Sequence, residues 1–73
     1  MSRAAVIGEG VRVQGFALAG AVVRIAEDQD EAVAAWRSLP PDIVVIVLTG
    51  RAAAWLGETP QPRRDALLVV MPV

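Results

Sequence analysis

Four glycines fall within the stretch from Ile7 to Gly20, IGEGVRVQGFALAG, which follows a short apolar segment. A glycine-rich turn between a strand and a helix is where many nucleotide-binding proteins hold phosphate, because backbone N–H groups and the helix dipole attract anions there. The same residue type also serves backbone shape and close packing. The first question is which of these roles the four glycines have.

Two phosphate-binding templates can be compared with this stretch. A dinucleotide-binding turn has the pattern G-x-G-x-x-G; Gly8 and Gly10 match it, but Val13 occupies the third glycine position. A Walker-type loop places two glycines four residues apart and follows them with Lys and Ser or Thr, which contact phosphate and magnesium. Gly10 and Gly15 have this spacing, but Phe and Ala stand at positions 16–17. Neither template is complete, so we expect no nucleotide or other cofactor here.

The alternative role for the glycines is structural. We expect Gly8 and Gly10 to shape the turn that leaves the first strand. We expect Gly15 and Gly20 to let the following helix lie close to its neighbours and then end.

Composition excludes several classes of function. The 73 residues include no Cys and no His, so thiolate nucleophiles, imidazole bases and the usual zinc ligands are missing. Seven basic residues, all Arg, against eight acidic ones give a net charge of −1, which predicts binding to neither nucleic acid nor an anionic membrane. The longest apolar run, residues 43–48, is far short of the roughly 20 residues that span a bilayer. We expect one cytoplasmic domain, residues 1–73, with no signal peptide, no membrane insertion and no metal site.

A phosphoacceptor receiver domain is a second possible function for a chain of this kind. Its chemistry needs carboxylates after the first and third strands and a Lys after a later one. Here Glu9 follows the first strand, but the third ends Leu48-Thr49-Gly50 and the sequence contains no Lys. The Ser and Thr residues have no candidate base beside them in the sequence. We therefore expect no catalytic residue.

Short apolar runs alternate with helical patterns along the chain, which is typical of βαβ units and a parallel sheet. The runs are rich in Val, Ile and Leu without polar alternation, so they predict strands covered on both faces. The predicted strands are residues 4–7, 22–26, 43–48 and 66–71.

Two helices have clear boundary signals. Asp28 and Glu31 have capping-box spacing, and the apolar positions Ala32, Val33, Trp36 and Leu39 line one face before Pro40. Thr49 can cap a shorter helix over residues 51–56, with Gly57 at the C-terminal cap.

The first helix has apolar side chains on two sides. Val13, Phe16, Ala17 and Gly20 share one face at helical spacing, which we expect to face the core. Val11 and Leu18 lie on another face, around Gln14. These two are either incidental exposed aliphatics or a small contact patch for another chain.

The order and spacing of five segments resemble the F subunit of vacuolar/archaeal-type (V/A-type) rotary ATPases. The resemblance covers nearly the whole chain, and residues 15–20 are its most distinctive part. The segments are AAVIGEG, VQGFALAG, DQDEAV, PDIVVIVLTGRAA and LLVVMP.

The resemblance implies a small doubly wound, Rossmann-like α/β domain, with four parallel strands flanked by three helices. It also implies a non-catalytic subunit of the central stalk, or rotor, which contacts the coiled-coil stalk subunit. Such a subunit couples ATP hydrolysis or synthesis to proton or sodium transport and lies peripheral to the membrane. Family members usually continue past the last strand into a C-terminal helical segment, which we do not find before Val73.

For the strand order 2-1-3-4, right-handed crossovers place the first helix on one face of the sheet and the other two on the opposite face. The first face is then incompletely covered, and the last strand is an apolar edge guarded only by Pro72. We expect this face and edge to bind the stalk subunit or a second copy of the chain. A free-standing receiver-like or self-associating interaction domain is the alternative. The predicted contact residues are Val11, Gln14, Leu18, Leu67, Leu68, Val69, Val70 and Met71.

Overall fold

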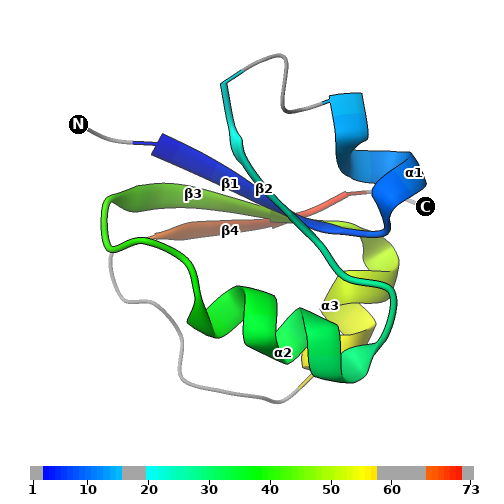
Figure 1. The fold of residues 1–73 in the computed structure, drawn as a ribbon. Coiled ribbons are helices and arrows are strands. Elements are labelled where there is room, and N and C mark those ends of the chain that lie inside the picture. Colours follow the sequence, from blue (N-terminus) through cyan, green and yellow to red (C-terminus); the bar gives the residue numbers. More distant parts are fainter. Residues whose placement is uncertain (1–2, 16–19, 58–65, 72–73) are drawn as a thin grey trace.

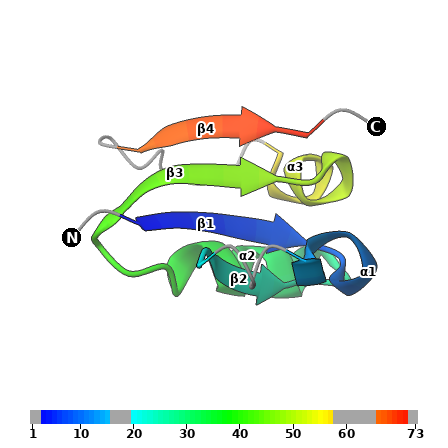
Figure 2. The same cartoon turned by 90° about the horizontal axis from the view of Figure 1, so that it is seen from above.

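A four-stranded parallel sheet in the order β2-β1-β3-β4 forms the centre of the protein in a computed structural model (Figures 1 and 2). The structure describes residues 3–15, 20–57 and 66–71. This confirms the predicted α/β class, the strand order and the parallel pairing. The strands are β1 (Arg3–Gly8), β2 (Val22–Ile25), β3 (Ile43–Leu48) and β4 (Leu67–Val70).

The three helices lie on both faces of the sheet. The longer two, α2 (Gln29–Arg37) and α3 (Gly50–Leu56), pack side by side under one face, and α1 (Gly10–Val13) lies on the other (Figure 1). This is the arrangement that right-handed crossovers produce for this strand order.

The main core lies between the sheet and the α2–α3 pair. Side chains alternate along β1, so that Ala5 and Ile7 face the two helices and Val6 faces the α1 side. Both sets are fully buried, since the exposed fractions are 0% for Ala5 and Ile7 and 1% for Val6. The remaining members of the core cluster are Ala26, Ala32, Ala35, Leu39, Ile43, Ile46, Leu48, Ala52 and Leu56.

Both predicted helix caps are present. The Asp28 carboxylate accepts the N–H of Glu31 at 2.8 Å, and the Glu31 carboxylate accepts the N–H of Glu27 at the same distance. The Thr49 hydroxyl accepts the N–H of Ala52 at 3.2 Å. Gly57 ends α3 with a positive φ of 47°, where glycine is favoured.

The first helix differs from expectation. It covers four residues, and Gln14 and Gly15 extend it by a tighter 3₁₀ turn; Phe16, Ala17 and Leu18 lie outside the described residues. Val13 is fully buried, as predicted, but Gly20 is exposed, so its placement on a core face is wrong.

The packing role expected for Gly15 and Gly20 is also wrong. Among the residues that the structure describes, no atom from elsewhere in the fold lies within 4 Å of where a side chain would begin at either residue. Gly20 instead serves the backbone, because its φ is 86°, in a region that L side chains rarely adopt.

The last strand is exposed, which fits the expected open edge but not the expectation that all four strands are covered on both faces. Its four residues, expected to be covered on both faces, are exposed by 63%, 51%, 40% and 50% in chain order. β4 pairs only with β3, so one of its backbone edges is open (Figure 2). The exposed strand is the most accessible apolar surface of the sheet.

Candidate protein-interaction site

The turn after β1 is built around one glycine. An ideal Cβ on Gly8 would lie 2.2 Å from Cγ2 and 2.6 Å from Oγ1 of Thr49, so only glycine fits without displacing that side chain. Thr49 itself is fully buried at the end of β3, and its N–H donates to the carbonyl of Ile7 at 3.1 Å. Close approach of the two strand ends therefore requires Gly8.

The space beside Gly8 holds a small hydrogen-bond network. The Thr49 hydroxyl donates to the Glu9 carboxylate while accepting the N–H of Ala52. This hydrogen bond from Thr49 is the main reason why the pKa of Glu9 is lowered, and the nearby charges of Arg12 and Arg51 act in the same direction. Glu9 is therefore an anion at neutral pH.

Three backbone donors of the glycine-rich turn are already used within the protein. Gly10 donates its N–H to the carboxylate of Glu27 at 3.1 Å. The N–H groups of Arg12 and Val13 donate to the Glu9 carbonyl at 2.9 and 3.1 Å. A bound phosphate would have to displace these acceptors and would face two carboxylates, so the arrangement disfavours phosphate binding at this turn.

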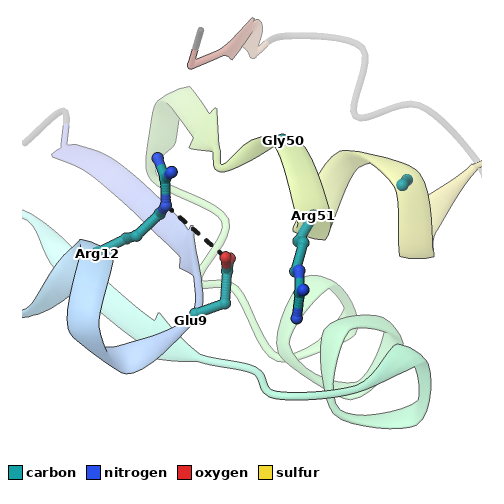
Figure 3. Close-up of a pocket in the computed structure, with 5 residues that line it drawn as sticks. Glu9, Arg12, Gly50 and Arg51 are labelled. Atoms are coloured by element: carbon teal, nitrogen blue, oxygen red, sulfur yellow. Dashed lines mark ion pairs between the residues drawn. The ribbon is translucent and has the colours of Figure 1, made fainter. Parts of the chain in front are cut away.

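A cavity of about 270 Å³ lies between α1 and α3 (Figure 3). It is at the carboxyl ends of β1 and β3, whose following helices pack on opposite faces; this is the switch point where open α/β sheets usually bind ligands. Its lining residues are Glu9, Arg12, Gly50, Arg51 and Ala54.

The charged side chains of the cavity come from two elements. Arg12 of α1 lies with its Nε 3.9 Å from a carboxylate oxygen of Glu9, and Arg51 of α3 lies on the other side of that carboxylate (Figure 3). Two cations and one anion leave a formal charge of +1 on the lining. Nothing in residues 3–15, 20–57 and 66–71 forms a cluster of His, Cys, Asp or Glu able to hold a metal ion.

The residues that the sequence singled out for partner contact fall into two groups. Val11 and Gln14 are exposed on α1 and the adjoining turn, Val11 by 84%. The other group is β4 together with Met71, which is partly buried and donates its N–H to Leu48 at 2.8 Å. Leu18 lies outside the described residues.

The two groups lie at different places on the sheet. The order β2-β1-β3-β4 places β3 between β1, which leads into α1, and β4. Register pairs Val6 with Val47 and Val47 with Val69, so Leu67 and Val69 face the α1 side while Leu68 and Val70 face the α2–α3 side. Only half of β4 therefore shares a face with α1.

The open edge of β4 also offers backbone groups. Because Met71 donates to β3, the alternation of a parallel ladder directs the N–H and C=O groups of Leu68 and Val70 outward. Such an edge can pair with an added strand.

Sequence reasoning missed the cavity. The sequence alone suggests only a phosphoacceptor role for Glu9, and it gives no motif that joins Arg12 to Arg51. Their positions, just after the first and third strands, were the available signal, since the carboxyl ends of neighbouring parallel strands meet at one edge of the sheet.

Two comparisons with known proteins bear on identity. No curated protein gives a significant match to the sequence. The family described as ATP synthase (F/14-kDa) subunit matches residues 4–73, which include every strand and helix described above except the first residue of β1. No helix in the described parts of the chain is long and apolar enough to cross a membrane. The chain therefore belongs to the ATP synthase (F/14-kDa) subunit family, the F subunits of V/A-type rotary ATPases.

Proposed function

We propose that this protein is a non-catalytic subunit of the central rotor stalk of a V/A-type ATPase or ATP synthase. It contacts the coiled-coil stalk subunit and, by turning with it, couples ATP hydrolysis or synthesis to proton or sodium transport. In this role it lies on the cytoplasmic side, attached to the membrane only through the complex.

One observation carries this proposal beyond family membership, namely the exposure of β4. Four consecutive aliphatic residues, Leu67–Val70, are 40–63% exposed and carry no charge among them. Natural edge strands usually carry charge or proline, or are covered, because an open apolar edge invites association. A stalk subunit that covers β4 would remove this apolar surface from water.

The glycine-rich turn supports a role without catalysis. The N–H groups of Gly10, Arg12 and Val13 bind the protein's own carboxylate and carbonyl groups, and Glu9 accepts a hydrogen bond from Thr49. These contacts occupy groups of the turn that could otherwise bind a phosphate.

The test is binding of the full chain to the purified coiled-coil stalk subunit by titration calorimetry. Leu68→Lys places a charge on β4, and Ala34→Lys places the same charge on an exposed position of α2 as a matched control. We expect Leu68→Lys to weaken binding at least about tenfold, because a buried unpaired charge is costly, and the control to bind like wild type.

Two results would contradict the proposal. The first is a wild-type chain that folds but does not bind the stalk subunit at micromolar concentration. The second is equal affinity for the two Lys variants, which would place the contact away from β4.

A further inference from the structure

We propose that the cavity between α1 and α3 receives one carboxylate side chain from a helix of the stalk subunit, with Arg51 as its main anchor and Arg12 beside it. This inference rests on the proposed function, because it names the chemistry by which the same partner is recognised. It adds a second, charged contact to the apolar contact at β4.

The two guanidinium groups are available for a partner. Arg51 is exposed, and within the described ranges it makes no hydrogen bond or ion pair. Arg12 has only the 3.9 Å approach to Glu9, which is longer than a hydrogen bond. A guanidinium presents a planar fork of N–H donors that matches the two oxygens of a carboxylate.

The charge of the lining favours a single negative charge. Thr49 holds Glu9 in place, and with Arg12 and Arg51 around it the formal sum is +1. One carboxylate neutralises this charge. A phosphate dianion would carry more negative charge than the lining can neutralise, and it would lie beside the Glu9 carboxylate. The N–H groups of Gly10, Arg12 and Val13 could not bind it, because they already donate to groups of the protein.

The size of the cavity also favours a side chain. Pockets for small molecules usually measure about 300–1,000 Å³, and the value of about 270 Å³ lies below that range. Gly50 and Ala54, one turn apart on α3, form part of its wall. Because Gly50 has no side chain and Ala54 has only a methyl group, a partner helix can approach closely enough for an Asp or Glu to reach Arg51.

The experiment compares three variants of the full chain in titrations against the stalk subunit at low and high salt. Arg51→Ala and Arg12→Ala each remove one cavity charge, and Arg37→Ala removes the same charge from the exposed end of α2. We expect Arg51→Ala to weaken binding by about tenfold or more and Arg12→Ala by less. Arg37→Ala should change it less than about twofold, since only long-range attraction is lost.

A conservative variant tests the geometry. Arg51→Lys keeps the charge but loses the fork of donors, so it should recover only part of the affinity. Arg51 is exposed, so thermal unfolding of every Arg51 variant should match that of wild type, which separates loss of contact from loss of fold.

The partner carboxylate is located by replacing the Asp and Glu residues of the stalk subunit one at a time with Asn or Gln. Replacement of the carboxylate that Arg51 binds should weaken binding as much as Arg51→Ala does. Combining that replacement with Arg51→Ala should weaken binding no further. Tight wild-type binding with equal affinities for Arg51→Ala and Arg37→Ala would overturn this inference alone. If the wild-type chain does not bind the stalk subunit, the proposed function itself is wrong.

A last experiment distinguishes a partner carboxylate from a free anion as the group that binds in the cavity. Inorganic phosphate is added to the free chain while the Nε–Hε signal of Arg51 is followed by NMR. We expect no saturable shift at millimolar phosphate. A saturable shift would contradict the assignment of the cavity to a partner side chain.

Discussion

At the scale of single residues, the contact between Gly8 and Thr49 organises the end of the sheet. Because Gly8 has no side chain, Thr49 can approach β1, donate to Glu9 and cap α3 with the same hydroxyl. Glu9 is then fixed beside Arg12 at the rim of the cavity. A single glycine thus affects two strands, one helix start and the charged site.

Gly8→Ala is predicted to lower the free energy of unfolding by about 1–3 kcal/mol, the usual range for overpacking a filled site. The added methyl group would displace the buried Thr49 side chain and break its hydrogen bonds. Gly15→Ala is the matched control and should be close to neutral, since its side-chain position is open. Urea unfolding measures both, and equal losses for the two variants would contradict this account.

Acid should destabilise the protein through Glu9 and Asp42. Hydrogen bonds from Thr49 and Arg3, respectively, lower the pKa of each carboxyl in the folded state. Near and below the ordinary carboxyl pKa of about 4, the unfolded chain therefore binds more protons than the folded protein. The stability that these two carboxylates contribute is present above this range and is lost as the pH falls.

Thr49→Val is predicted to reduce this acid sensitivity. It removes the hydroxyl that lowers the pKa of Glu9, and loss of the α3 cap costs about 1 kcal/mol at neutral pH. Thermal melts from pH 7 to about pH 3 should show a shallower decline for Thr49→Val than for wild type or Thr49→Ser. Parallel declines would show that Glu9 is not the titrating group.

The residues that could be predicted from sequence act locally. Asp28 and Thr49 cap helices that begin beside them, so spacing alone identified both. The contacts of Gly10 with Glu27 and of Glu9 with Thr49 join positions 17 and 40 residues apart, and no local pattern specifies them. The glycine roles could be assigned only after the fold had brought these partners together.

At the scale of elements, the strands were easier to predict than the first helix. Runs of Val, Ile and Leu identified all four strands to within one residue at each end. The first helix was expected to continue toward Gly20, but regular α-helix ends at Val13. Glycines weaken helical propensity, and Val13 is the one described α1 residue that is buried.

The exposed last strand is predicted to open more readily than the centre of the sheet. The N–H of Met71 donates to β3 at 2.8 Å, and the N–H of Thr49 donates to β1 at 3.1 Å, both at the carboxyl ends of their strands. β4 buries less apolar surface than β3 does. The free energy of the opening that exposes the Met71 amide should therefore be lower than that for the Thr49 amide. Equal protection in native-state hydrogen exchange would contradict this.

At the scale of the whole molecule, the sheet has two interaction features at different places. β4 supplies an apolar edge, and the carboxyl ends of β1 and β3 carry the Arg12–Arg51 cavity. The sequence indicated the edge, because its apolar run is continuous. The cavity depends on strand order, because only the neighbouring positions of β1 and β3 bring Arg12 and Arg51 together.

In the absence of its partner, the chain is predicted to self-associate through β4. Two copies of an uncharged edge strand can pair antiparallel about a twofold axis. Sedimentation should show a concentration-dependent dimer for wild type and Ala34→Lys, and a monomer for Leu68→Lys. A dimer that survives Leu68→Lys would require a different interface.

Hydrogen exchange of the full chain, alone and saturated with the coiled-coil stalk subunit, tests the central claim most directly. We expect binding to slow exchange in β4 and around Arg12 and Arg51, while the outer face of α2 is unchanged. Slower exchange confined to α2, with β4 and the cavity unaffected, would contradict it.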